Sequence, residues 1–289
     1  MSKTKGNTES RGFQSIPVVD ISQLLNGDAN QRQAVAEQIG QAAREVGFFQ
    51  IINHGISAST RDGLKQAAKE FFDRPVDYKM QHFIGLSSNH RGYVPQGEEA
   101  PDPKKKDLKE AFDVAMELPE SDPDVGPHNP LLGPNPWPGI SGFRERVEAY
   151  YDATYQVGRS LMAAFAVALD LPEDRFLRYV TKPPSQLRLI HYPYDPTVVD
   201  AEGIGAHTDY ECFTLLLPTT PGLEVMNGDG DWIPVPFIED ALVVNIGDML
   251  EIWTNGTYVA TSHRVRKIPE ERYSFPLFFA CFLPCKVAD

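Results

Sequence analysis

The chain has 289 residues, and its 27 Lys and Arg against 40 Asp and Glu give a formal net charge of −13. With 42% hydrophobic and 23% charged residues, the composition is that of a globular protein with enough chain for a substantial core. The acidic balance argues against a nucleic-acid partner, because binding a phosphate backbone needs clustered positive charge. No apolar run is long enough to span a membrane and no signal segment stands out, so we expect a cytoplasmic protein that binds no membrane.

The first 15 residues are polar and predict a disordered tail ahead of a single domain over 16–289. Residues 84–142 are rich in proline and predict a loop-rich, lid-like segment within a helix-rich part that extends from 16 to 184. The elements expected in that part are a strand at 16–21, a helix at 31–45 ended by Gly47, a strand at 48–52, and helices at 59–72 and 144–169.

Residues 185–285 form the predicted catalytic core and favour a series of short strands. Turn signals such as Asn227-Gly228 and Asn255-Gly256 separate the apolar runs, which lie at 187–192, 213–217, 242–246, 258–265 and 275–283. Several short strands after packing helices indicate a double-sheet barrel with helices on its outside. The expected fold class is therefore α+β, mainly β.

Three residues of the β-rich part are candidate metal ligands. In an extended strand residues i and i+2 face the same side, so His207 and Asp209 can present an imidazole and a carboxylate to one point. His263, from another strand, would complete two nitrogens and one oxygen on one face of an ion. This two-histidine, one-carboxylate set is typical of non-haem Fe(II) oxygenases and leaves about three coordination positions open.

Arg272 and Ser274 have the same i, i+2 spacing on a predicted strand. An arginine that points into a barrel is costly unless a carboxylate meets it, and its planar fork suits an acid. We therefore expect a diacid cosubstrate with a 2-oxo acid end on the metal and the other end on Arg272. Tyr192, at the end of an alternating strand, is a further candidate donor to the distal carboxylate.

Five segments, in this order, resemble the isopenicillin N synthase-like family of Fe(II)/2-oxoglutarate-dependent oxygenases: IPVVD at 16–20, GFFQIINHG at 47–55, HTD at 207–209, SHRV at 262–265 and ERYS at 271–274. The resemblance extends from about residue 16 to 283. It implies a double-stranded β-helix (jelly-roll) core flanked by N-terminal and central helices.

The resemblance also implies the chemistry of the site. Fe(II) would be bound by His207, Asp209 and His263, and 2-oxoglutarate by Arg272, Ser274 and Tyr192. With O2, the enzyme would oxidise, most simply hydroxylate, a small molecule and release succinate and CO2.

The chain departs from the family pattern in two places. Ile190 stands where the family often has Asn. The sequence ends at Asp289, without the helix that covers the active-site mouth in many members, so we expect an open mouth or closure by another subunit or by 84–142. The protein is expected to be a monomer or a homodimer.

Candidate substrate contacts are Arg91 and Tyr93 in the lid-like segment and Phe213 and Phe278 on the strands. Three other polar residues favour structural roles. His54 and Asp248 lie in predicted turns, and His191 faces away from the site because its neighbour Tyr192 faces in.

The residues leave three other interpretations open. The same iron site could serve an isopenicillin N synthase-type or ethylene-forming oxidase. The same ligands could hold zinc in a hydrolase, although that function would not explain why Arg272 points into the barrel. A non-catalytic jelly roll that binds a metal or a ligand is the third. Iron-dependent formation of succinate from 2-oxoglutarate separates these interpretations.

Overall fold

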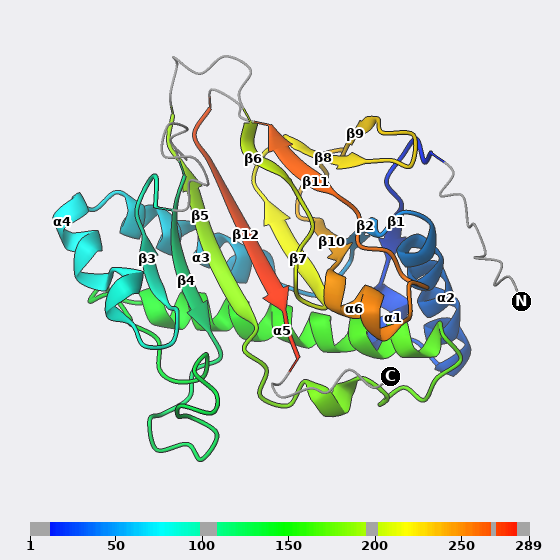
Figure 1. Ribbon diagram of the computed structural model, residues 1–289, viewed down its shortest axis with the longest axis horizontal. Helices are drawn as coiled ribbons and strands as arrows, with labels where there is room; N and C mark the ends of the chain where they lie inside the picture. The colour runs from blue at the N-terminus through cyan, green and yellow to red at the C-terminus, as the bar shows by residue number, and fades with distance from the viewer. Residues whose placement is uncertain (1–11, 99–108, 195–201, 267–269, 282–289) are drawn as a thin grey trace, which may run out of the picture.

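Two β-sheets face one another in the computed structural model, which describes residues 12–98, 109–194, 202–266 and 270–281 (Figure 1). The large sheet has eight strands in the order β1-β2-β10-β7-β12-β5-β4-β3, and the small sheet has four in the order β6-β11-β8-β9. Apart from the parallel pair β1 and β2, the paired strands are antiparallel. The fold is the predicted α+β, mainly β jelly roll.

The strands of the large sheet are β1 Val18–Asp20, β2 Phe48–Ile52, β3 Gly92–Val94, β4 Glu110–Ala115, β5 Gln186–Tyr192, β7 Phe213–Pro218, β10 Leu242–Ile246 and β12 Arg272–Phe279. Those of the small sheet are β6 Glu202–His207, β8 Leu223–Met226, β9 Trp232–Pro234 and β11 His263–Arg266.

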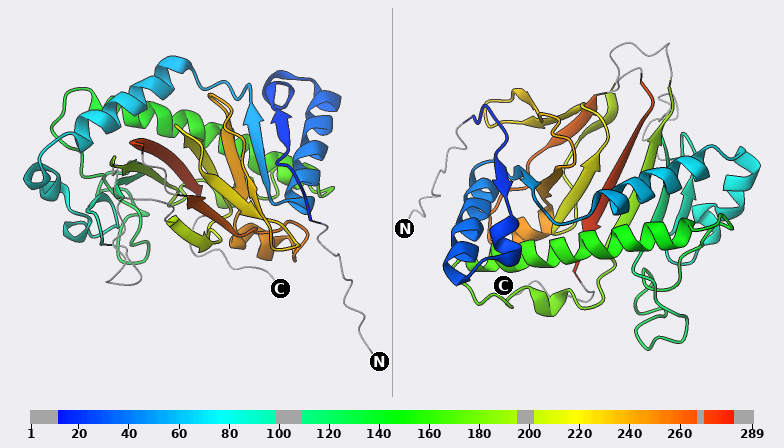
Figure 2. Two further views of the ribbon diagram at one scale, coloured as in Figure 1. Left: turned by 90° about the horizontal axis from the view of Figure 1, so that it is seen from above. Right: turned by 180° about the vertical axis from the view of Figure 1, so that it is seen from behind.

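The three longest helices, α2 Ala29–Glu45, α3 Ala58–Phe72 and α5 Phe143–Val167, lie on one outer face of the large sheet, as the view from behind in Figure 2 shows. The shorter helices are α1 Ser22–Asn26, α4 Val76–Lys79 and α6 Asp248–Trp253, with single 3₁₀ turns at Met80–His82, Ile84–Leu86 and Leu177–Tyr179. None of the helices in the described part of the chain has the length and apolar character needed to cross a bilayer.

Local sequence explains where α2 begins and ends. Asp28 caps its first turn, and the Gln31 side chain completes a capping box by accepting from the Asp28 backbone N–H. Gly47 has φ +71° and donates to the Ala42 carbonyl, which is the left-handed stop that the sequence predicts. A side chain at Gly47 would also meet the backbone carbonyl of Val259.

The structure corrects several predicted boundaries. The loop-rich segment 84–142 also holds two strands that were not predicted, β3 and β4, which extend the large sheet beside β5. Much of the strand expected at 258–265 is irregular, and β11 starts at His263. The last strand begins at Arg272 instead of Phe275. The predicted tail lies largely outside the described residues.

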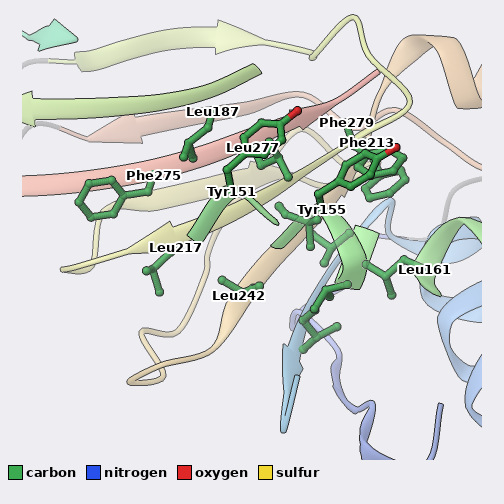
Figure 3. Close-up of a cluster of buried hydrophobic side chains, with 14 of the residues drawn as sticks. Tyr151, Tyr155, Leu161, Leu187, Phe213, Leu217, Leu242, Phe275, Leu277 and Phe279 are labelled. Atoms are coloured by element: carbon green, nitrogen blue, oxygen red, sulfur yellow. The ribbon is translucent and has the colours of Figure 1, made fainter. Parts of the chain in front are cut away.

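The core between α5 and the large sheet is aromatic and aliphatic (Figure 3). Tyr155 of α5 stacks on Phe279 of β12, with ring centroids 5.4 Å apart, and Phe279 stacks in turn on Phe213 of β7 at 4.7 Å. Each fully buried aromatic ring of this kind contributes a large share of the hydrophobic stabilisation. The helix therefore fixes β7 and β12 from behind.

Strand alternation then decides what faces the space between the two sheets. In β7, Phe213, Leu215 and Leu217 are buried against the helical side, so Thr214, Leu216 and Pro218 face the other way. In β12, Phe275, Leu277 and Phe279 take the helical side, so the cavity side receives Arg272, Ser274, Pro276 and Phe278. The packing of the core thus points polar groups into the cavity.

The close approach of α5 to β12 can be tested at Gly158. A Cβ at this position would lie 2.4 Å from Cε2 of the buried Phe279 ring. Gly158→Ala should therefore lower the free energy of unfolding by about 1–3 kcal/mol through overpacking, although alanine is the better helix former. The measurement is chemical denaturation followed by circular dichroism.

Gly63→Ala is the matched control. Gly63 also lies inside a helix, α3, but the nearest atom to its added Cβ would be Cγ of Arg146 at an ordinary 3.5 Å. This variant should gain about 0.5–1 kcal/mol. If Gly158→Ala and Gly63→Ala changed the free energy of unfolding equally, the close contact between Gly158 and Phe279 would be contradicted.

Candidate functional site

Two strands of the small sheet bring the predicted metal ligands together. β6 ends at His207 and β11 starts at His263, and the two histidines are direct partners in the antiparallel register. Asp209 follows two residues after β6. Nε2 of His207 lies 3.5 Å from Oδ1 of Asp209, and Nε2 of His263 lies 3.7 Å from the same oxygen.

One donor atom from each of the three residues lies within 4.8 Å of the other two. Nitrogen and oxygen ligands about 2.1 Å from a common ion are separated by roughly 3 to 4 Å, so the arrangement suits a single ion. Asp209 and His263 are each only 7% exposed, whereas the His207 side chain is 38% exposed. The candidate metal site therefore opens to one side.

The imidazoles are held by their other nitrogens. Nδ1 of His207 lies 2.8 Å from the Gly205 carbonyl, to which it donates, so Nε2 is the nitrogen available to bind a metal. Nδ1 of His263 lies 3.4 Å from the Thr261 carbonyl, and the Phe48 ring meets the His263 ring edge-on at 5.1 Å. Burial lowers the pKa of His263, which favours the neutral form that binds metals.

The carboxylate of Asp209 is oriented by two donors on its far oxygen. The Thr214 hydroxyl and the Asn245 amide, the latter at 2.7 Å, both donate to Oδ2, so Oδ1 is left to face the imidazoles. Burial alone would raise the pKa of Asp209. The hydrogen bond with His207, together with those from the two donors, outweighs burial and lowers this pKa to about 2. Asp209 is thus ionised and points a single oxygen at the site.

A cavity extends from these residues between the two sheets, with about 660 Å³ of space that includes its opening to solvent. Side chains of β5, β7 and β12 line one wall, and those of β6, β8 and β11 line the other. Arg272, Ser274 and Tyr192 all face this cavity, as the sequence predicts, and Phe278 does too. The cavity therefore joins the candidate metal ligands to a buried cation.

Arg272 is 7% exposed, and no carboxylate in the described part of the chain pairs with it. Its guanidinium carbon lies 4.1 Å from the centre of the Tyr192 ring, and its Nε is buried without a hydrogen-bond partner. A buried guanidinium without an anion is costly, so the arrangement suits an acidic ligand that enters the cavity.

Three predicted substrate contacts, Arg91, Tyr93 and Phe213, are not among the residues that line the cavity. Arg91 is 1% exposed, and its guanidinium donates to the carbonyls of Met116, Leu131 and Gly133 and to Asn135. It therefore ties a loop to the fold and does not reach the cavity.

The two aromatic candidates, Tyr93 and Phe213, are also turned away from the cavity. Tyr93 is buried, and its hydroxyl donates to Oε2 of Glu110 at 2.6 Å instead of reaching the cavity. Phe213 faces the α5 side because strand parity turns Thr214, its neighbour, to the cavity.

The structural roles predicted for two histidines are confirmed. His54 bonds the Asp240 carbonyl through Nε2 at 2.8 Å and accepts from the Ile56 N–H. His191 faces away from the cavity and lies between two carboxylates, those of Glu110 and Glu271. Asp248, expected in a turn, instead begins α6.

Sequence patterns did not single out the two side chains that orient Asp209. Asn245 is the single polar residue in the apolar run of β10, and this contrast could have marked it as a functional residue. Thr214 carried none, because threonine is common in strands. Asn245 and Thr214 donate to the same oxygen of Asp209 because the pairing of β10 with β7 sets the two residues opposite each other.

The Thr214 hydroxyl offers a test of this orientation. Thr214→Val removes the donor at nearly constant shape, so the Asp209 carboxylate should turn more freely and the affinity for Mn(II) or Co(II) should fall about 10- to 100-fold. Thr214→Ser keeps the hydroxyl and should bind metal nearly as the parent does. Titration calorimetry measures both, with thermal unfolding of the metal-free proteins as a check on folding. Metal binding by the valine variant at the parental affinity would contradict the orientation.

Comparisons with known proteins agree with this geometry. A family model described as non-haem dioxygenase in morphine synthesis N-terminal matches residues 16–139, and the 2OG-Fe(II) oxygenase superfamily model matches 183–280. The chain is 36% identical over 294 residues to the 2-oxoglutarate-dependent dioxygenase tropC of Talaromyces stipitatus, covering 96% of this chain and 90% of that protein.

Solved structures show the same likeness. A 2OG-Fe(II) oxygenase family protein from Caulobacter crescentus superposes with a TM-score of 0.83 at 33% identity, over 93% of this chain and 88% of that one. The dioxygenase for auxin oxidation 1 from Arabidopsis thaliana, in its complex with 2-oxoglutarate, gives a TM-score of 0.71 at 26% identity, over 95% and 98%. The chain belongs to the 2-oxoglutarate- and Fe(II)-dependent oxygenase superfamily, and it is a dioxygenase that uses Fe(II), 2-oxoglutarate and O2 on a small-molecule substrate.

Proposed function

We propose that His207, Asp209 and His263 bind the Fe(II), and that Arg272, Ser274 and Tyr192 bind the distal carboxylate of 2-oxoglutarate. The observation that carries this proposal is the buried Arg272 guanidinium, which has no carboxylate partner in the described residues and faces the cavity that the triad borders. The reaction we propose is hydroxylation: substrate, 2-oxoglutarate and O2 become the hydroxylated product, succinate and CO2.

The residues present fit a ferrous ion. Two imidazole nitrogens and one carboxylate oxygen on one face are the donors that non-haem Fe(II) enzymes use, and they leave positions for a 2-oxo acid and O2. When bound, the iron supplies the site at which O2 and the 2-oxo acid react. The carboxylate of Asp209, kept ionised and directed by its two donors, contributes one anionic ligand atom.

The protein's other work is to orient the cosubstrate. The planar fork of Arg272 suits a carboxylate, and its position over the Tyr192 ring limits its rotation. Ser274, two residues along β12 on the same face, adds a hydroxyl donor. Anchoring the far end of the diacid in this way fixes the distance from its 2-oxo end to the metal ligands.

Several further expectations remain predictions: a cytoplasmic location, a monomeric or homodimeric state, and no nucleic-acid or membrane partner. The acidic composition of the chain supports the absence of a nucleic-acid partner. We propose hydroxylation instead of desaturation or ring closure because it is the simplest outcome of oxidising one C–H bond.

Exchanging Arg272 for lysine tests the assignment. Arg272→Lys keeps the charge but loses the two-pronged contact, so the affinity for 2-oxoglutarate should fall about 10- to 100-fold while that for Mn(II) stays near the parental value. The control is Arg146→Lys on α5, whose guanidinium pairs with Glu70 on the surface of the helical layer. Calorimetric titrations of metal and then of cosubstrate give both constants. Equal losses of metal and cosubstrate binding would reject the assignment of Arg272.

Iron-dependent succinate formation tests the reaction. The parent protein with Fe(II), ascorbate and 2-oxoglutarate should release succinate, faster when a true substrate from a small-molecule panel is added. His207→Ala should abolish metal binding and succinate together. Consumption of O2 without succinate would instead support an isopenicillin N synthase-type oxidase.

A further inference from the structure

Three buried polar atoms that line the same cavity have no hydrogen-bond partner in the described protein. They are Nε of Arg272, the Tyr192 hydroxyl and the Thr220 hydroxyl. The first two belong to the proposed cosubstrate site, but nothing in the sequence pattern singled out Thr220. Because buried polar groups in proteins nearly always have partners, all three indicate a ligand that supplies acceptors.

Two of these residues are paired across neighbouring strands, and the third follows a strand on the other side. Arg272 of β12 is the direct partner of Tyr192 on β5. On the other side of β12, Ser274 pairs with Pro218, the last residue of β7, and Thr220 follows two residues later. Residues directly opposite one another in a sheet project from the same face, so Tyr192 and Arg272 share the cavity side, and Thr220 lines the same cavity.

The chain just beyond β7 is held to β12 at this point. The Thr219 hydroxyl donates to the Tyr273 carbonyl at 2.7 Å and accepts from the Tyr273 N–H at 3.0 Å, and the Thr219 N–H donates to the same carbonyl. Since Tyr273 lies between Arg272 and Ser274, this clamp fixes the neighbouring Thr220 relative to both.

Gly222 completes the surroundings of the guanidinium. Its φ is +128°, and a Cβ there would lie 3.0 Å from Nη1 of Arg272. The Gly222 carbonyl accepts from the Arg266 N–H at 2.8 Å, which ties the segment to β11. The turn after β7 therefore runs close beside the Arg272 head group, with no side chain at the nearest point.

We infer that Thr220 is a further binding residue of the cosubstrate, whose hydroxyl donates to the distal carboxylate beside Arg272. This inference rests on the proposed function and deepens it. A carboxylate offers about four acceptor positions, and Arg272, Ser274, Tyr192 and Thr220 together supply donors for all of them. A site with these four donor residues binds a 2-oxo acid that has a second carboxylate more tightly than one that lacks it.

The experiment compares two substitutions and two ligands. Thr220→Val removes the hydroxyl and keeps the shape of the side chain, whereas Thr220→Ser keeps the hydroxyl. Each variant and the parent, loaded with Mn(II) in the absence of O2, are titrated calorimetrically with 2-oxoglutarate and with 2-oxobutyrate, which lacks the distal carboxylate. Thermal unfolding shows that the variants are folded.

We expect Thr220→Val to bind 2-oxoglutarate about tenfold more weakly than the parent, as the loss of a hydrogen bond to a charged group implies. Thr220→Ser should bind it nearly as the parent does, and 2-oxobutyrate should bind alike to all three proteins. Mn(II) affinity should not change, because Thr220 is not among the residues that gather at the triad.

Two results would overturn the inference about Thr220 and leave the proposed function intact. In one, Thr220→Val binds 2-oxoglutarate at the parental affinity although Arg272→Lys does not. In the other, the valine variant loses both ligands equally, which would show that Thr220 only shapes the cavity. If the Mn(II)-loaded parent binds no 2-oxoglutarate at all, the proposed function fails first and the inference fails with it.

Discussion

The alternation of β7 and β12 between two opposite environments is the constraint on which the site depends. Every second residue of these strands is an apolar side chain in the core on the helical side, and Phe279 stacking on Phe213 locks that layer. The residues between them must face the small sheet. A slip of one residue would bury the Arg272 guanidinium among aromatic rings and turn Phe275 into the cavity, which the cost of burying an unpaired charge forbids. The hydrophobic core therefore sets the orientation of the polar site.

The two ends of the cavity carry opposite charge. At one end, Asp209 is kept ionised beside two imidazoles, and at the other Arg272 is buried over the Tyr192 ring. Neither charge neutralises the other, since no ion pair joins them in the described residues. A metal cation at the first end and a carboxylate at the second would satisfy both, and a diacid that also binds the metal would bridge them. The stability of the loaded protein should thus exceed that of the empty one.

Behind the cavity, the large sheet holds a second polar cluster that supports it. Lys79 lies 2.6 Å from Glu110, and His191 lies between Glu110 and Glu271. Burial would raise the pKa of Glu110, but the hydrogen bonds from His191 and Lys79 lower it, so the carboxylate is ionised. The ring of His191 also stacks on Tyr273 at 4.7 Å. Because His191 directly precedes Tyr192 and Tyr273 directly follows Arg272, this cluster fixes the backbone that carries the proposed cosubstrate site.

The sequence by itself determined the fold class, the triad and the Arg-x-Ser pair, because each depends on spacing within one strand or on short motifs. His207 and Asp209, or Arg272 and Ser274, share a face through the two-residue period of an extended chain, whatever the rest of the fold does. Only the tertiary structure decided the partners of those groups. Asn245 reaches Asp209 through the register between β10 and β7, and the fold brings Thr220, which follows β7, to the cavity that Arg272 lines. Arg91 donates to groups of a loop some 25 to 44 residues away, a contact that local patterns do not encode because it forms only once the chain has folded back on itself.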